Sequence, residues 1–103
     1  MVKLRGINVY PTGIGVILRE INQLNGEYFC RVRRDNTGKD TMSVVCEAKA
    51  SFSENIDSKK RIETILRQKL GVGVEVIVVE AGGTAEITQI NARQKPIRLV
   101  DER

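Results

Sequence analysis

Histidine and tryptophan are absent from this sequence, and only two cysteines and four aromatic residues occur among its 103 residues. Without histidine, the most common general base and every Ser-His or Cys-His nucleophile pair are missing. Cys30 and Cys46 are too few for a disulfide framework and are not spaced as a zinc-binding pair. We therefore expect neither a self-contained hydrolase nor a metal site, and we expect both cysteines to be reduced thiols in the core.

Long hydrophobic runs are also lacking. No apolar stretch approaches the length that crosses a bilayer, and the first residues have no apolar segment of the kind found in secretion signals. Hydrophobic residues make up 41% of the chain and charged residues 29%, as in ordinary globular proteins. The expectation is a single cytoplasmic domain over residues 1–103, with one modest core and no membrane partner.

The charge balance is only mildly basic. Seventeen basic and thirteen acidic residues give a formal net charge of +4, which suits an anionic partner but is low for a nucleic-acid binder. The aromatic residues are scattered as Tyr10, Tyr28, Phe29 and Phe52. They do not form the paired platform on which single-stranded bases stack, so nucleic acid is not the expected partner.

Hydrophobic periodicity predicts six elements in the order strand, helix, strand, strand, helix, strand. Their expected ranges are 3–9, 11–22, 26–34, 41–50, 55–70 and 72–79. This order is that of the split βαβ arrangement, an α+β ferredoxin-like two-layer sandwich. The nearly continuous valine run of the last range predicts a central strand.

The turn-forming stretch 35–40 predicts a hairpin centred near Thr37 and Gly38. This hairpin would bring Cys30 and Cys46 close to opposite each other on the buried face. Its other face would carry Arg31 and Arg33, which we interpret mainly as a solvated face. That face is mixed in polarity, so part of it is expected to be covered by another segment.

A tail follows Gly82 and Gly83. Two short apolar pieces, near Ile87 and near Leu99, are expected to return to the body of the domain. The residues between them would form an exposed loop with Lys95 at its tip. The fold prediction is thus a two-layer sandwich with a C-terminal extension that carries a loop.

Near the front of the chain, the stretch 5–12 has the sequence RGINVYPT and predicts a strand-to-helix junction. Pro11 suits the first helical position, where its missing N–H costs nothing. Gly6 suggests close approach by a neighbouring backbone or a ligand. Gly13 and Gly15 weaken the helix, and two explanations remain: close packing of the helix on the sheet, or space for a ligand.

The segment VKLRGINVYPTGI resembles the start of the small C-terminal domain of adenylate-forming ligases, most closely the phenylacetate–coenzyme A ligase group. The hairpin, the second helix and the run KLGVGVEVIVVE are also similar to that group. The resemblance covers essentially the whole chain. It implies a mobile domain whose partner, a large N-terminal adenylation domain, would precede Met1 and bind ATP and the carboxylic acid.

The resemblance also implies site residues. Lys95 matches the lysine that enters the active site for adenylation, because the stretch 95–101 is similar to the family's ending. The contacts to coenzyme A and the acyl-adenylate at the domain interface are assigned to Arg5, Gly6, Asn8, Tyr10 and Arg98. ATP and coenzyme A would be substrates of the full enzyme, with Mg²⁺ bound beside ATP in the other domain and no cofactor held by this chain alone.

Alternatives remain at this point. Gln94 stands where the family has a glycine, so Lys95 is equally well explained as an exposed lysine in a basic tail. A ferredoxin-like regulatory module that binds a small ligand fits the same element order. An RNA-binding sandwich that uses Arg31, Arg33 and the tail is a further alternative, which the missing sheet aromatics oppose.

Overall fold

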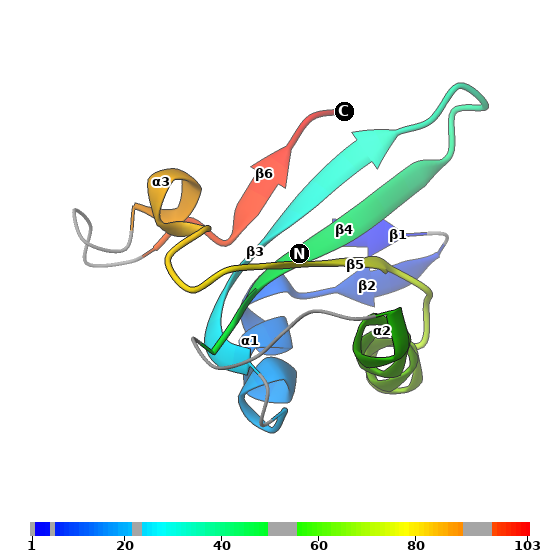
Figure 1. Ribbon diagram of the computed structural model, residues 1–103. Coiled ribbons are helices and arrows are strands. Elements are labelled where there is room, and N and C mark those ends of the chain that lie inside the picture. Colours follow the sequence, from blue (N-terminus) through cyan, green and yellow to red (C-terminus); the bar gives the residue numbers. More distant parts are fainter. Residues whose placement is uncertain (1, 5, 22–23, 50–55, 90–95) are drawn as a thin grey trace.

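The computed structural model describes residues 2–4, 6–21, 24–49, 56–89 and 96–103, with the backbone alone for residues 56–58. Its main sheet has four strands in the order β5-β4-β3-β6, and two helices lie together on one side of it (Figure 1). The strands and helices are β1 Val2–Leu4, β2 Ile7–Val9, α1 Pro11–Arg19, β3 Leu24–Arg34, β4 Asp40–Ala48, α2 Ile56–Leu70, β5 Glu75–Val79, α3 Ala85–Thr88 and β6 Leu99–Asp101. The predicted α+β ferredoxin-like class is confirmed.

The two long helices form where their apolar residues recur at the helical period. Pro11 occupies the first position of α1, and Ile14 and Leu18 of this helix are fully buried. In α2, Ile62 and Leu66 face the core, and Gly71 ends the helix with a φ of +83°. Both helices therefore bury one stripe against the sheet, as their periodicity predicts.

The β3–β4 hairpin turns at Gly38, whose φ is +84°. Asp35 Oδ1 accepts hydrogen bonds from the backbone N–H groups of Thr37 and Lys39, which stabilises the turn. Cys30 pairs with Val44, and Cys46 pairs with Tyr28. The two cysteines are therefore diagonal neighbours on the two strands, offset by two residues from the nearly opposite pair that was expected. Both side chains are buried, as expected for core thiols.

The beginning of the chain differs from the prediction. The expected strand 3–9 is divided into β1 and β2, which pair antiparallel as a separate two-stranded sheet. Gly6 has a φ of +85° and reverses the chain between them. Val2, Leu4 and Val9 remain in the core, so the hairpin still covers one side of it.

The prediction of a central strand at 72–79 is wrong. β5 pairs only with β4 among the described strands and forms an edge of the sheet, while β3 and β4 are central. Its valine run is nearly continuous because both faces are partly covered. Val76 and Val78 join the helix-side core, and Ile77 and Val79 are half-buried on the other face.

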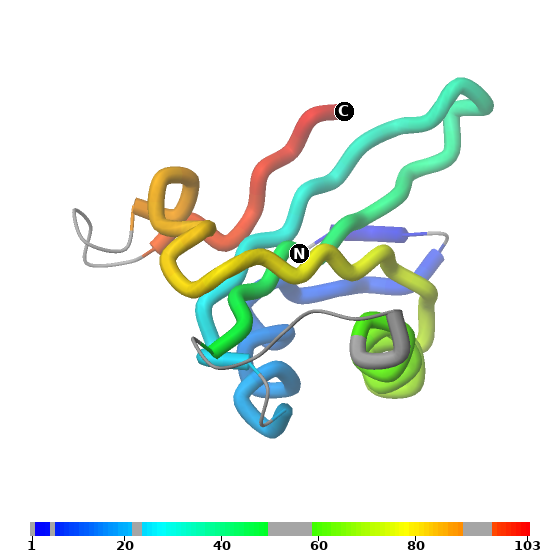
Figure 2. Tube along the Cα trace, in the orientation of Figure 1, coloured from blue at the N-terminus to red at the C-terminus, as the bar shows by residue number. Residues whose placement is uncertain are grey.

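The tail returns to the body of the domain in two pieces, as predicted. α3 follows β5, and β6 pairs parallel with β3 from Cys30 to Val32. Figure 2 shows that this returning segment runs beside β3, at the sheet edge opposite β5. Within the described ranges, no helix is long and apolar enough to cross a membrane.

Candidate functional site

Residues 6–10 run from the β1–β2 turn at Gly6, through β2, to the start of α1, and this stretch, called the junction below, exposes most of its residues. Gly6, Ile7 and Asn8 are exposed, whereas the next residue, Val9, is buried in the core. A Cβ added to Gly6 would meet no described atom within 4 Å, so its glycine is required by the positive φ and not by crowding. The backbone at this turn is therefore open to approach by another molecule.

Tyr10 continues the same surface. It caps α1 with extended backbone dihedrals and without a side-chain cap, and its carbonyl accepts a 2.9 Å hydrogen bond from the Gly13 N–H. In the described part of the chain, the exposed large hydrophobic residues are Ile7 at 37%, Tyr10 at 59% and Val16 at 61%. All of them fall within residues 7–16 of the sequence, in the junction and in the helix that follows it.

Beneath the junction, Tyr28 of β3 contacts the first turn of α1. Its hydroxyl donates a 2.6 Å hydrogen bond to the carbonyl of Pro11. A Cβ on Gly15 would lie only 2.9 Å from Cε1 of the Tyr28 ring. Of the two explanations for Gly15, close packing of the helix on the sheet is therefore the one that the structure supports; at Gly13 a Cβ would make only an ordinary 3.8 Å contact with Tyr10.

Arg98 lies immediately before β6. Its Nη1 donates a 2.7 Å hydrogen bond to the carbonyl of Tyr28 and is 3.4 Å from Glu27 Oε2. Its guanidinium carbon is 4.6 Å from the centroid of the Tyr28 ring, a cation–π distance. The Arg98 side chain is only 17% exposed. Its guanidinium, which was predicted to contact a ligand, therefore mainly contacts residues of this domain.

Lys95 and Arg5, two of the predicted site residues, lie outside the described residues. The chain on either side of the lysine segment is described. The Ile97 N–H donates a 2.8 Å hydrogen bond to the carbonyl of Thr88, and the Cys30 N–H donates a 2.7 Å bond to the carbonyl of Arg98. The end of α3 and the start of β6 are thus joined to each other and to β3.

A buried carboxylate that sequence reasoning missed holds the start of the tail. Glu47 of β4 alternates with core residues, so its side chain emerges on the sheet face opposite α1 and α2. It accepts hydrogen bonds from Asn25 Nδ2 at 2.9 Å and from the backbone N–H groups of Gly82 at 2.7 Å and Thr84 at 2.9 Å, and from the Thr84 hydroxyl. Burial opposes ionisation, but the donors of Asn25, Thr84 and Gly82 outweigh it and lower the pKa of Glu47. A glutamate within a strand gives no sequence signal for this role, because its partners lie 22 to 37 residues away.

The arginine row on the hairpin is largely paired. Arg31 and Arg33 both contact Glu102 Oε1, at 3.4 and 2.7 Å, and Arg34 contacts Asp40 at 3.0 Å. Asp40 also forms an ion pair with Arg103 near the C-terminus, with 3.0 Å between Asp40 Oδ2 and Arg103 Nη1. Glu102 of the tail and Asp40 of β4 thus pair with these arginines, and this weakens the RNA-binding alternative, which needs that row free for phosphate.

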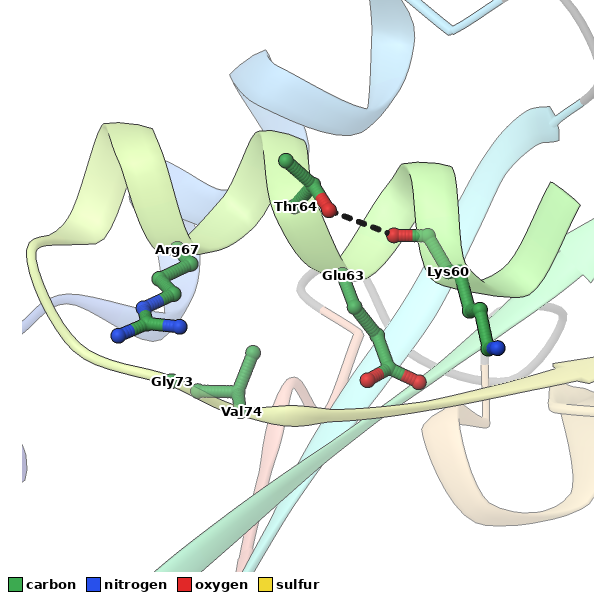
Figure 3. Close-up of a pocket in the computed structure, with 6 residues that line it drawn as sticks. All are labelled: Lys60, Glu63, Thr64, Arg67, Gly73 and Val74. Carbon is green, nitrogen blue, oxygen red and sulfur yellow. Dashed lines mark hydrogen bonds between the residues drawn. The ribbon is translucent and has the colours of Figure 1, made fainter. Parts of the chain in front are cut away.

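A hollow of about 410 Å³ lies between α2 and the segment that leads into β5. Figure 3 shows Lys60, Glu63 and Arg67 of α2 projecting beside Gly73 and Val74, with the Thr64 hydroxyl bonded back to the Lys60 carbonyl at 2.9 Å. The hollow contains none of the predicted site residues. In the described part of the chain, no group of three or more His, Cys, Asp or Glu side chains is placed to hold a metal ion.

The architecture, with an exposed glycine turn before a helix and a C-terminal tail bound along the sheet, defines a small ferredoxin-like α+β domain. Residues 6–103 match the model of the AMP-binding enzyme C-terminal domain. The chain belongs to this family and is a C-terminal domain of an adenylate-forming ligase. No curated protein matches the sequence significantly.

Solved structures agree on the fold. A domain of phenylacetate-coenzyme A ligase from Bacteroides vulgatus is similar over 100% of this chain and 92% of its own, with 22% identity and a TM-score of 0.79. A 2-hydroxyisobutyryl-CoA ligase in complex with 2-HIB-AMP and CoA, in the thioesterification state, is similar over 100% of this chain, with 21% identity and a TM-score of 0.81. The same ligase in its postadenylation state has a TM-score of 0.71 and 20% identity over 100% of this chain. This chain spans 21 to 22% of the length of those ligase chains.

Proposed function

We propose that this chain is the mobile C-terminal domain of an AMP-forming acid–coenzyme A ligase that acts on an aryl acid such as phenylacetate. The domain would alternate between an orientation for adenylation and an orientation for thioester formation. The observation that carries the proposal is the exposed junction around Gly6 and Tyr10, on a chain whose family is that of AMP-binding enzyme C-terminal domains. The similarity to a phenylacetate–coenzyme A ligase domain supports the choice of acid.

In the thioester-forming orientation, the junction would face the active site. Arg5, Gly6, Asn8 and Tyr10 would contact coenzyme A and the acyl-adenylate. A glycine at the turn lets backbone pass close to the pantetheine chain, where a Cβ would obstruct it. The open space beyond Gly6 and the exposure of Tyr10 are consistent with this role.

In the adenylation orientation, Lys95 would enter the site. Attack of a carboxylate on the α-phosphate brings negative charges together and builds more charge on the departing pyrophosphate. A compact ammonium that bridges acid and phosphate stabilises this transition state electrostatically. ATP, with its Mg²⁺, would be held by the adenylation domain, which is the expected partner of this chain.

The two faces predict opposite effects in the full enzyme. We expect Lys95→Ala to slow acyl-adenylate formation by about a hundredfold or more, a typical loss for one electrostatic group, and to leave thioester formation from preformed adenylate nearly unchanged. Pyrophosphate release measures the first half-reaction, and coenzyme A thioester formation from added acyl-adenylate measures the second. Equal loss in both would remove Lys95 from catalysis.

The reverse pattern is expected for Gly6→Val, since its bulk would obstruct coenzyme A and leave adenylation intact. Gly38→Val is the matched control, because Gly38 has a similar φ of +84°, also has no described atom within 4 Å of an added Cβ, and lies in the β3–β4 turn outside the junction. Normal thioester formation by Gly6→Val, with protein that is folded, would contradict the assignment of the junction.

A further inference from the structure

Tyr28 contacts both segments to which the proposed function assigns a role in catalysis, the junction and the segment that follows Lys95. It lies on β3 and is 3% exposed. On one side, its hydroxyl donates to the Pro11 carbonyl at 2.6 Å, one residue after Tyr10. On the other side, its backbone carbonyl accepts a 2.7 Å hydrogen bond from Arg98 Nη1, three residues after Lys95.

The contact with α1 depends on the hydroxyl and the ring of Tyr28. Pro11 is buried and its carbonyl accepts the Tyr28 hydroxyl, so Tyr28→Phe removes one hydrogen bond from the interior of the domain. The ring can approach this carbonyl only because residue 15 has no Cβ, which would lie 2.9 Å from Cε1 and 3.1 Å from the hydroxyl oxygen. Distances below 3.0 Å to a Cβ require something to shift. Gly15 and the Tyr28 hydroxyl therefore act as a pair.

The contact with the tail is equally specific. The guanidinium of Arg98 lies over the Tyr28 ring with 4.6 Å between its central carbon and the ring centroid. The same arginine is 3.4 Å from Glu27 Oε2, and its own carbonyl accepts the Cys30 N–H at 2.7 Å. A planar guanidinium can stack and donate at once, which a lysine at this position could not reproduce.

We infer that Tyr28 is a positioning residue that holds the Tyr10–Pro11 junction and the Arg98 segment in one fixed arrangement on β3. A domain that presents two faces in turn must keep each face in place while the other is used. Tyr28 does this through separate groups: its hydroxyl holds the junction, and its ring and carbonyl hold Arg98. This inference rests on the proposed function for its consequence in catalysis, but not for the contacts themselves.

The contacts predict a selective change in hydrogen exchange of the 103-residue chain. Tyr28→Phe keeps the ring and is expected to speed exchange of the α1 amides from Gly15 to Leu18 by about fivefold, the factor for one lost hydrogen bond. The Cys30 and Glu102 amides, which bond to Arg98 and Val32 carbonyls, should be unchanged. Arg98→Gln should give the opposite pattern, and Tyr28→Leu should affect both groups of amides.

Two further variants serve as controls. Gly15→Ala displaces the whole Tyr28 ring, so it should disturb both the hydroxyl contact and the Arg98 contact and reproduce the pattern of Tyr28→Leu. Ile62→Val removes one methyl group from the core on α2 and destabilises the domain by about 1 kcal/mol, which matches the loss of a hydrogen bond. It should raise exchange without distinguishing the two groups of amides.

In the full enzyme, Tyr28→Phe should slow thioester formation about fivefold and leave adenylation unchanged. Ile62→Val should change the ratio of the two rates by less than about twofold. If Tyr28→Phe leaves α1 exchange unchanged, or shifts both half-reactions in the same proportion as Ile62→Val, the inference is wrong. If the wild-type enzyme forms no thioester with any aryl acid, the proposed function fails, and the exchange pattern alone then decides whether Tyr28 fixes both segments.

Discussion

Glu47 illustrates how much a single buried side chain can determine. Its two carboxylate oxygens receive donors from Asn25, Gly82 and Thr84, and they thereby fix the turn that follows β5. The residue is only 3% exposed, so these donors replace the water that an ionised carboxylate needs. The tail that leads to the proposed catalytic segment therefore starts from a rigid point on the sheet.

We expect Glu47→Gln to lower the free energy of unfolding by about 1–3 kcal/mol, because its amide NH₂ would face donors and leave some of them without an acceptor. Urea unfolding of the chain measures this loss. Glu75→Gln is the matched control, since Glu75 is exposed on β5 and should change stability little. A Glu47 variant as stable as the control would show that the donors are satisfied equally well without the carboxylate.

The same carboxylate predicts a pH dependence. The pKa of Glu47 is lower in the folded chain than its usual value of 4.5, so the unfolded chain binds the proton more readily. Its contribution to stability is therefore complete above pH 4.5 and is lost as the pH falls through the folded pKa. Unfolding measured between pH 7 and pH 3 should show a smaller loss for Glu47→Gln than for the wild type. An identical pH profile in both proteins would contradict this.

The cysteines give a third prediction at this scale. Burial raises the pKa of Cys30 to about 12, and the nearby positive charge of Arg98 only partly opposes it. At pH 8 the reactive thiolate is therefore very rare in the folded chain. We expect thiol reagents to label Cys30 only after addition of denaturant, with mass spectrometry of freshly prepared protein showing no disulfide. Rapid labelling of the native chain would show that the β3–β4 hairpin opens readily.

At the scale of elements, Gly6 determines that the first strand of the sequence prediction becomes two strands. A short β-prone run over 3–9 predicts one strand, but a φ of +85° at Gly6 divides it into β1 and β2. We expect Gly6→Ala to destabilise the fold by about 1 kcal/mol or more, since L residues are strained there. Gly73→Ala is the control and should be neutral, because a Cβ there meets no described atom within 4 Å and the φ is ordinary. Equal urea unfolding midpoints for Gly6→Ala and Gly73→Ala would contradict the claim that the positive φ requires glycine at residue 6.

The elements that the sequence predicts well are those whose signal is local. The helical periods of α1 and α2, Pro11 at the first helical position and the turn at Gly38 are all visible within a few residues. The edge position of β5 is not visible, because a valine run records burial and not the number of neighbouring strands.

The candidate site divides in the same way. Gly6 and Tyr10 could be proposed from the motif RGINVYP, and the structure places both at the surface. The internal use of Arg98 could not be predicted, since its partners on β3 lie about 70 residues away. Glu47 was missed for the same physical reason. Long-range hydrogen bonds depend on which strands become neighbours, and a single sequence does not record this.

At the scale of the whole molecule, positive charge is unevenly placed. The stretch 59–70 carries five basic residues and one acidic residue, which equals the formal net charge of +4 of the chain, so the remainder is neutral. On the sheet, Arg31 and Arg33 share the C-terminal carboxylate of Glu102, and Arg34 pairs with Asp40 of β4. Arg103 holds the pKa of Asp101 down at about 2. The ion pairs of the tail and the sheet therefore offset most, but not all, of the positive charge of these arginines.

The chain spans about a fifth of the 2-hydroxyisobutyryl-CoA ligase chains that share its fold. If it works as the mobile domain of such a ligase, it should supply groups to an active site and not form the site alone. We expect the 103-residue chain to release no pyrophosphate from ATP and phenylacetate, and to do so only when joined to an adenylation domain. The joined protein carrying Glu75→Gln serves as the positive control, and the one carrying Lys95→Ala should fail in the first half-reaction. Acyl-adenylate formed by the chain alone would overturn the view that its two faces serve a partner domain.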